Sequence, residues 1–244
     1  MKTIFLKEIS HFFSSITGYV VIAFFILISG LFMWIFRDTA IIYTPFASLD
    51  PFFQLAPFLL LFLVPAITMK IFSDEFQQGT MELLFTRPVL TENIILGKFL
   101  ASATLVILAI LPTLLYYVSI YFLAEPKGNV DHGAIIGSYI GLLFLALTFT
   151  AIGIFASALT SQQVGAFLLG VLISFFMYWG FYYVSNLPFF DVRMEYVVQK
   201  WGMMHHYENM NRGSIDSRGI IYFGLLTWFF HRLTYLVLEM KRNR

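Results

Sequence analysis

Few residues of this chain have the types and spacing that a catalytic, metal-binding or nucleotide-binding site requires. His205, His206 and Glu208 lie close together, but a helical metalloprotease site needs His-Glu-x2-His. We therefore interpret these three as ordinary polar residues of a connection. Gly97-Lys98-Phe99 approaches a phosphate-binding loop, but it lacks the upstream glycine and the following hydroxyl. The chain thus carries no ATP site of its own, and its energy source would be a partner or an ion gradient.

Coupling to an ion gradient would place carboxylates or histidines inside membrane spans. The six apolar spans predicted below contain no Asp or Glu, and His231 and Arg232 interrupt the last one. Arg232 can snorkel inward or pair within the helix bundle. We expect no ion-coupled transport, no catalytic residue, no metal and no directly bound cofactor. The chain has no cysteine, which excludes disulfides and thiol catalysis.

The composition indicates a membrane protein. Of the 244 residues, 59% are hydrophobic and 12% are charged, whereas soluble domains have roughly 45–50% apolar and about 25% charged residues. These values exclude a soluble enzyme, a disordered chain and a secreted disulfide scaffold. A net charge of +1 gives no sign of a nucleic-acid-binding surface.

Six stretches are long enough to cross a bilayer core of about 30 Å. We predict an all-α membrane protein with one domain, residues 1–244, and spans near 18–36, 52–69, 99–124, 133–160, 164–190 and 219–238. The first span is too long for a signal-peptide core and is expected to stay as an anchor. Prolines inside the second and third spans predict kinks whose freed carbonyls pack against neighbours.

The distribution of basic residues predicts the orientation. With the N-terminus inside, nine of the 15 Lys and Arg residues lie on the inner side. The other six are Arg37, Lys127, Arg193, Lys200, Arg212 and Arg218. Both termini are therefore predicted to be cytoplasmic, in a multi-pass protein of the bacterial inner membrane.

Residues 1–17 are predicted to form an amphipathic helix in the membrane interface. Phe5, Ile9 and Phe12 recur at helical spacing, whereas Lys7 and His11 lie on the other side. We expect this helix to turn at Gly18 into the first span. The sequence leaves open whether the helix only anchors in lipid or also binds a partner.

The cytoplasmic loop 70–98 carries helix signals. Ser73 can cap a helix with Asp74 and Glu75 in its first turn, and Gly79 breaks that helix. Thr80 caps a second short helix, 81–86, which Pro88 ends, and Thr91 caps the third span with Glu92 in its first turn. The short helix has an apolar face made by Met81, Leu84 and Phe85. That face either fits a partner's groove or packs on lipid and the bundle.

Three further patterns concern helix packing and the external side. Small residues at Gly133, Gly137 and Gly141 predict close approach of another helix, from this subunit or another. The external connection 184–218 is expected to form short interfacial helices that cap the outer mouth. Four tyrosines suit either an outer aromatic belt, which we favour, or a translocation path: Tyr116, Tyr117, Tyr121 and Tyr139.

Two motifs resemble the signature of the ABC-2 family of ABC-transporter permeases. The first is Glu75-x3-Gly79-Thr80-x-Glu82-Leu83-Leu84-x-Thr86-x-Pro88, followed by Gly97-Lys98-Phe99-Leu100. The second, before the last span, is Arg212-Gly213-x-Ile215-Asp216-x-Arg218-x3-Tyr222-Phe223. Within the family, stretches such as Gly18-Tyr19-Val20-Val21-Ile22 look most like the GldF-like permeases associated with gliding motility in Bacteroidota. The resemblance covers essentially the whole chain.

The resemblance implies a dimer, with a second copy or a paralogue, and an ABC ATPase subunit that binds ATP and Mg. It implies that the loop after the second span couples to this ATPase. The motif residues to which this role carries over are Glu75, Gly79, Thr80, Glu82, Leu83, Leu84 and Pro88. We include Asp74, Met81 and Phe85 in the same coupling loop, although Phe85 stands where the family commonly has a small or aliphatic residue. GldF-like permeases imply a GldA-like ATPase and a GldG-like accessory membrane protein. The implied activity is ATP-driven export or assembly work; the alternatives are an exporter of another substrate and a non-transporting assembly factor.

Overall fold

The apolar runs of the sequence fold as long helices. The computed structural model describes residues 1–43, 48–86, 89–188, 191–214 and 216–243, except for the side chains of residues 83–85. Six helical segments are long and apolar enough to cross a membrane: Ile16–Trp34, Asp50–Gln77, Thr91–Leu123, His132–Leu159, Gln163–Ser185 and Ser217–Arg242. The described residues contain no strand. The prediction of an all-α membrane protein with six spans is confirmed.

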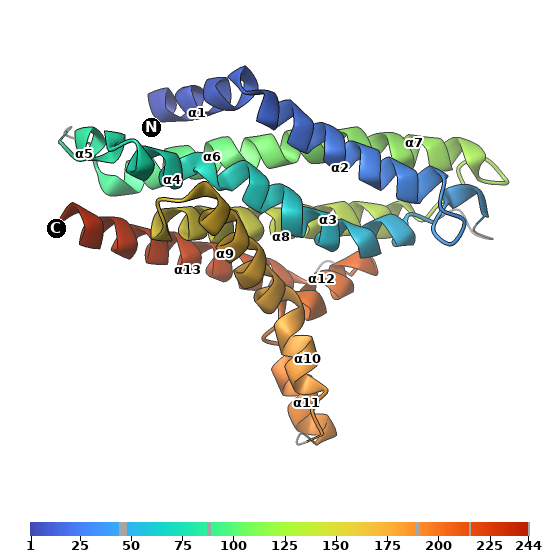
Figure 1. Ribbon diagram of the computed structural model, residues 1–244. Helices are drawn as coiled ribbons and strands as arrows, with labels where there is room; N and C mark the ends of the chain where they lie inside the picture. Colours follow the sequence, from blue (N-terminus) through green and yellow to red (C-terminus); the bar gives the residue numbers. More distant parts are fainter. Residues whose placement is uncertain (44–47, 87–88, 189–190, 215, 244) are drawn as a thin grey trace.

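The helices follow one another with short connections (Figure 1). They are α1 (Lys2–Ser14), α2 (Ile16–Trp34), α3 (Asp50–Thr68), α4 (Lys70–Gln77), α5 (Thr80–Phe85), α6 (Thr91–Ile110), α7 (Leu114–Leu123), α8 (His132–Leu159), α9 (Gln163–Phe175), α10 (Phe181–Ser185), α11 (Val192–Gln199), α12 (Met203–Asn211) and α13 (Ser217–Arg242). A 3₁₀ turn, η2 (Leu111–Thr113), joins α6 to α7. A π-helical turn, η3 (Phe176–Gly180), joins α9 to α10.

Helix α8 lies at the centre of the bundle, between α3 and α13 (Figure 1). Its apolar window is 72% buried, whereas that of α2 is 22% and that of α13 is 17%. The difference follows from side-chain size, because the small residues of α8 allow neighbouring helices to approach closely. The outer spans α2 and α13 expose large apolar side chains such as Phe24 and Leu225, as lipid-facing helices do.

Two of the span prolines, Pro57 and Pro112, interrupt the regular α-helical hydrogen bonding. Pro112 lies in η2, where the third span passes from α6 to α7. Pro57 lies inside α3 and has no N–H to donate to the carbonyl of Phe53, four residues earlier. That carbonyl instead accepts a hydrogen bond of 2.7 Å from the Tyr207 hydroxyl. A side chain of α12 thus satisfies the backbone group that the proline frees.

Several predicted helix ends are wrong. The chain turns at Ser15, which is extended, and Gly18 lies within α2 against the backbone of Phe12. Ser73 is not an N-cap, because the second span continues to Gln77 and the Ser73 hydroxyl bonds back to the Met69 carbonyl. Thr91 is the first residue of α6 rather than its cap, and its hydroxyl donates to Glu239.

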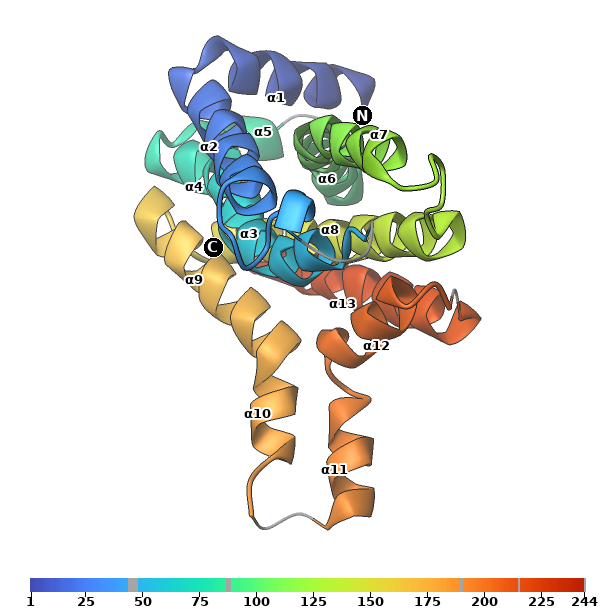
Figure 2. The same cartoon turned by 90° about the vertical axis from the view of Figure 1, so that its right-hand side faces the viewer.

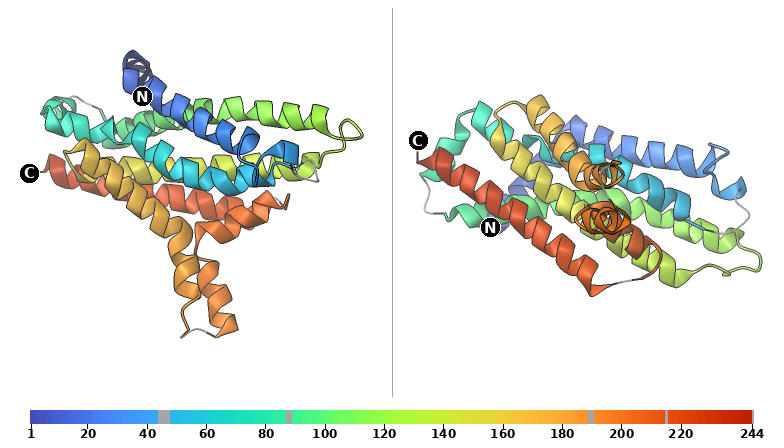
Figure 3. Two further views of the ribbon diagram at one scale, coloured as in Figure 1. Left: turned by 45° about the vertical axis from the view of Figure 1, so that its right-hand side comes forward. Right: turned by 90° about the horizontal axis from the view of Figure 1, so that it is seen from below.

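The fifth span leaves the bundle, and its described helix ends at Ser185 rather than near residue 190. Beyond η3, α10 and α11 project from the bundle as an antiparallel pair (Figures 2 and 3). The prediction that α11 caps the outer mouth is wrong, because its contacts are with α10, where Gln199 Nε2 lies 3.2 Å from Ser185 Oγ. No residue of α11 is buried. Helix α12 returns to the bundle and packs on α8.

Candidate functional site

A buried lysine joins three helices at the end of the bundle that carries α4 and α5 (Figure 1). Lys98, in the second turn of α6, is 1% exposed. Its Nζ lies 2.8 Å from Glu8 Oε1 on α1 and 3.0 Å from Glu75 Oε2 on α4. It also donates to the carbonyl of Ile71, at 2.7 Å. Glu8 Oε1 and the Ile71 carbonyl accept hydrogen bonds from the ammonium, whereas Glu75 Oε2 lies within ion-pair distance but accepts no hydrogen bond.

The charges around Lys98 balance. Lys7 Nζ lies 3.2 Å from the second oxygen of Glu75, so two lysines meet two carboxylates. The ring of Phe72 adds an aromatic contact, with its centroid 5.0 Å from the Lys98 ammonium. Balanced charge is what burial requires, because an unpaired ion in a low-dielectric interior costs several kcal/mol. We call Lys7, Glu8, Glu75 and Lys98 the ion cluster.

Sequence reasoning missed most of this cluster. In the sequence, Lys98 belongs to an incomplete phosphate-loop match and to the family motif Gly97-Lys98-Phe99-Leu100, and no pattern singles out Glu8. Glu75, matched to the coupling loop, directs its carboxylate to Lys98 and Lys7 within the chain. The position of Lys98 directly before an apolar span is a signal in the sequence, because a lysine that is buried there needs an acidic partner.

The small-residue face of α8 receives the junction between α3 and α4. Ser157 Oγ accepts hydrogen bonds from the backbone N–H groups of Phe72 and Ser73, at 2.9 and 3.1 Å. It donates to the Met69 carbonyl at 2.9 Å. One turn earlier, an added Cβ on Gly153 would lie 2.1 Å from Thr68 Oγ1. The second span therefore packs closely on α8, and is hydrogen-bonded to it, at the point where α3 continues into α4.

The short helix of the loop forms, but it spans Thr80–Phe85 rather than 81–86, so Thr80 is its first residue and not its cap. Gly79 has a φ of +68°, a left-handed value that favours glycine, and α5 begins directly after it at Thr80. Met81 is 2% exposed and packs with Phe72 and Leu238 inside the bundle, so it does not contribute to a partner-facing surface. Glu82 is exposed. Three side chains, Leu83, Leu84 and Phe85, and the whole of Pro88 lie outside the described part of the chain.

At the opposite end, the glycine stripe of α8 packs on the Arg-Gly motif. Added Cβ atoms on Gly137 and Gly141 would lie 3.1 Å from Gly213 Cα and 2.9 Å from Met210 Cβ, respectively. The partner of this stripe is therefore in the same chain. Gly133 does not belong to the contact, because the nearest atom to its Cβ would be its own N-terminal neighbour Asp131, at 3.4 Å.

The Arg-Gly motif has a structural role in forming the turn between α12 and α13. Gly213 has a φ of +79°, and an added Cβ would lie 3.0 Å from Ala134 Cα. Asp216 caps α13, because its Oδ1 accepts the N–H of Arg218 at 3.0 Å. Arg212 and Arg218 are exposed.

Two of the four tyrosines, Tyr116 and Tyr139, are bonded inside the bundle and do not belong to an aromatic belt. The hydroxyl of Tyr116 lies 3.0 Å from Ser29 Oγ, and that of Tyr139 donates to the Thr113 carbonyl at 2.9 Å. Both therefore link helices inside the bundle. Tyr117 bonds to His132 at 2.8 Å, and Tyr121 is partly exposed.

The histidines of α12 are packed as structural residues. His206 stacks on Tyr222, with ring centroids 4.1 Å apart, and Nε2 lies 3.0 Å from the Lys200 carbonyl. Burial lowers the pKa of His206, which favours the neutral ring. Among the described residues, no group of three His, Asp or Glu side chains is placed to hold a metal ion.

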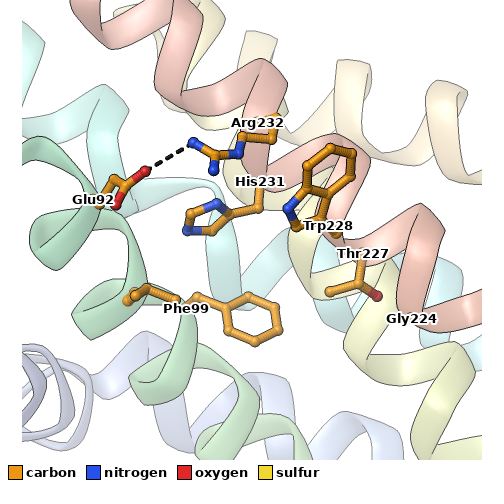
Figure 4. A pocket seen from close by; sticks show the side chains of 8 residues that line it. Glu92, Phe99, Gly224, Thr227, Trp228, His231 and Arg232 are labelled. Atoms are coloured by element: carbon orange, nitrogen blue, oxygen red, sulfur yellow. Dashed lines mark hydrogen bonds and ion pairs between the residues drawn. The ribbon is translucent and has the colours of Figure 1, made fainter.

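Arg232 pairs with Glu92 of a neighbouring span. Figure 4 shows Arg232 and His231 reaching from α13 toward α6, where Arg232 Nη1 lies 2.8 Å from Glu92 Oε1. The guanidinium also lies 5.7 Å from the ring of Trp228. These residues line a pocket of about 320 Å³. Because Glu92 lies in the first turn of α6, the pair holds the C-terminal half of α13 against the third span.

Comparison with protein families gives one match. The sequence model described as "ABC-2 family transporter protein" matches residues 3–188. The matched range contains all four residues of the ion cluster and the segment from α4 to α6. Comparison with curated proteins found no match.

Proposed function

The chain belongs to the ABC-2 family of transporter proteins, and we propose that it is a permease subunit that a separate ABC ATPase drives through α4 and α5. Family membership implies a multi-pass membrane subunit and an ABC ATPase partner. The subunit itself is non-catalytic, and ATP and Mg bind in the ATPase. The work done is export or assembly across the bacterial inner membrane, with both termini in the cytoplasm.

The ion cluster is the observation that carries this proposal. Glu75 lies on α4, one turn before Gly79 and α5, and its carboxylate contacts lysines of α1 and α6. A movement of α5 and α4 would therefore be transmitted to α1 and to the third span through the contacts of Glu75 with Lys7 and Lys98. The exposed residues available to an ATPase at this end include Gln78, Thr80 and Glu82.

We further propose that the complex is of the gliding-motility type. The sequence resemblance to GldF-like permeases supports this proposal, and it implies a GldA-like ATPase and a GldG-like accessory membrane protein. A second permease copy or a paralogue would complete the transporter. The paired helices α10 and α11 offer a surface for it, because Tyr183, Val192 and Tyr196 are 60%, 82% and 53% exposed.

Affinity purification from native membranes, followed by an ATPase assay, tests the proposal. We expect an ABC ATPase to co-purify and to be lost when Glu82 is changed to Lys. Glu125→Lys is the matched control, because Glu125 is equally an exposed acid but lies in the loop between α7 and α8. Purification of the wild-type chain without any ATPase, in several mild detergents, would favour the assembly-factor alternative.

A further inference from the structure

A cavity of about 590 Å³ lies at the end of the bundle opposite the ion cluster. Its walls come from the first turns of α3, from η3 and from α12. Asp50, Gln54 and Arg212 are exposed, whereas Tyr178 is buried beneath them. The volume is within the range of small-molecule sites, roughly 300–1,000 Å³. Neither the family match nor the coupling loop accounts for this cavity.

The aromatic wall of the cavity is produced by the π-helical turn. Single π turns within α-helices are rare and occur frequently at functional sites. Here η3 carries Tyr178 and Trp179, whose rings meet edge to face with centroids 4.4 Å apart. Tyr178 is 4% exposed and is fixed between Phe149 and Tyr207. The wall is therefore preformed.

Only 4% of Tyr178 is exposed, and its hydroxyl forms no hydrogen bond with the described residues; the hydroxyl is not among the fully buried atoms that lack a partner, so it is accessible from the cavity. Buried tyrosine hydroxyls are normally paired. Its neighbour Tyr207 follows that rule and donates to the Phe53 carbonyl at 2.7 Å. Because Tyr178 lines the cavity, a ligand bound there can provide the missing partner.

The charges that line the cavity are also unpaired. Asp50 on α3 and the half-buried Glu208 on α12 form no ion pair within the described chain, and neither does Arg212. The cavity is therefore lined by two carboxylates and one guanidinium, and its lining has a net negative charge. A partly desolvated carboxylate without a cation is unfavourable, so the complementary ligand is positively charged.

We propose that this cavity binds an organic ammonium ion. Glu208 and Asp50 supply the negative charge, and Trp179, which is only partly buried, supplies an aromatic surface that attracts cations. The Tyr178 hydroxyl accepts an N–H of the ammonium group. This inference is independent of the ATPase partner, because it concerns the other end of the bundle and needs only the purified chain.

Calorimetric titration of the full-length protein in phosphatidylcholine nanodiscs tests the site. The probe is benzylammonium, and benzyl alcohol is its neutral isostere; titration of empty nanodiscs corrects for partition into lipid. We expect saturable binding of benzylammonium and binding of benzyl alcohol that is about tenfold weaker or more, since one removed charge interaction of this kind corresponds to at least a factor of about ten.

Variants separate the role of charge from that of folding. Glu208→Gln keeps the shape of the side chain, and we expect it to weaken benzylammonium binding by about tenfold or more. If Glu208→Gln disturbs folding, which altered elution in gel filtration would show, Asp50→Asn tests the same charge requirement. Asp50 is exposed, so its substitution is less disruptive to the fold. Glu125→Gln, an exposed acid away from the cavity, is expected to leave binding unchanged.

Three results would overturn the proposal. The first is the absence of saturable benzylammonium binding to the wild-type protein. The second is equal affinity for benzyl alcohol, which would indicate a site for neutral ligands. The third is unchanged affinity in a Glu208→Gln or Asp50→Asn variant that elutes like the wild type.

Discussion

Glu8 and Lys98 are 90 positions apart in the sequence, yet Glu8 Oε1 and Lys98 Nζ lie 2.8 Å apart. Their side chains are 9% and 1% exposed. This contact fixes the N-terminal helix α1 on the third span. Helix α1 is therefore part of the packed protein, and the same lysine also contacts Glu75 of α4.

Loss of the buried cation is expected to destabilise the protein. Lys98→Met leaves Glu8 and Glu75 largely buried without it, which we expect to lower the free energy of unfolding by about 3–5 kcal/mol. Thermal unfolding in detergent, followed by circular dichroism, measures the effect. Lys127→Met is the control, because Lys127 is exposed in a loop. Equal midpoints for the two variants would contradict the structural role of the cluster.

Gly79 is expected to matter through its backbone. A Cβ there would meet no atom within 4 Å, so the cost of Gly79→Ala comes from the positive φ alone, about 1–2 kcal/mol. Gly79→Asn tolerates that conformation better. We expect ATP turnover of the purified complex to fall more in the alanine variant than in the asparagine variant. The same turnover in both variants and the wild type would argue against a role of this bend in coupling.

Two glycine-to-alanine substitutions are expected to change the free energy of unfolding in opposite directions. In Gly153→Ala the new Cβ would lie 2.1 Å from Thr68 Oγ1, so we expect destabilisation by about 1–3 kcal/mol. In Gly224→Ala the Cβ meets nothing within 4 Å, and alanine stabilises a helix by up to about 1 kcal/mol. Unfolding midpoints should therefore fall in the first variant and not in the second. The reverse order would show that α3 and α8 are not in close contact.

Pro57 leaves the Phe53 carbonyl without its helical donor, and the Tyr207 hydroxyl bonds to that carbonyl instead. Removing this one hydroxyl oxygen tests how much the hydrogen bond contributes to stability. Tyr207→Phe leaves the Phe53 carbonyl buried without that donor, and we expect a loss of about 1–3 kcal/mol. Tyr183→Phe, at a position that is 60% exposed, controls for loss of a hydroxyl. Thermal unfolding compares the two, and similar midpoints would mean that the carbonyl finds another donor.

The absence of cysteine makes the orientation easy to measure. Single cysteines at Gln78 and Asn209 occupy exposed positions in the coupling loop and on α12. In intact cells we expect an impermeant thiol reagent to label the Asn209→Cys variant and not the Gln78→Cys variant. The opposite pattern would place both termini outside.

The spans could be predicted because the bilayer requires long apolar runs, and such runs are visible in the sequence. The fourth span, predicted as 133–160, is His132–Leu159 in the structure. The first, predicted as 18–36, is Ile16–Trp34. Length and hydrophobicity are local properties, and they suffice to find helices of this kind.

The ion cluster and helix ends depend on tertiary contacts that a single sequence does not display. Ser73 has the preference of an N-cap, but Ser157 of α8 supplies the partners that let the helix continue past it. Lys98 looks like an interfacial lysine until α1 covers it. The π turn that places Tyr178 has no local sequence signature, and the cavity beside it was therefore not foreseen.

The wide separation of Glu8 and Lys98 has a consequence for biosynthesis. Helix α1 leaves the ribosome first, but its buried partner follows 90 residues later, which at roughly 5–20 residues per second takes about 5–20 s. During that time Glu8 faces water or lipid headgroups, and α1 cannot take its final position until the third span is inserted. Final docking of the N-terminus is therefore a late step in the assembly of this protein in the membrane.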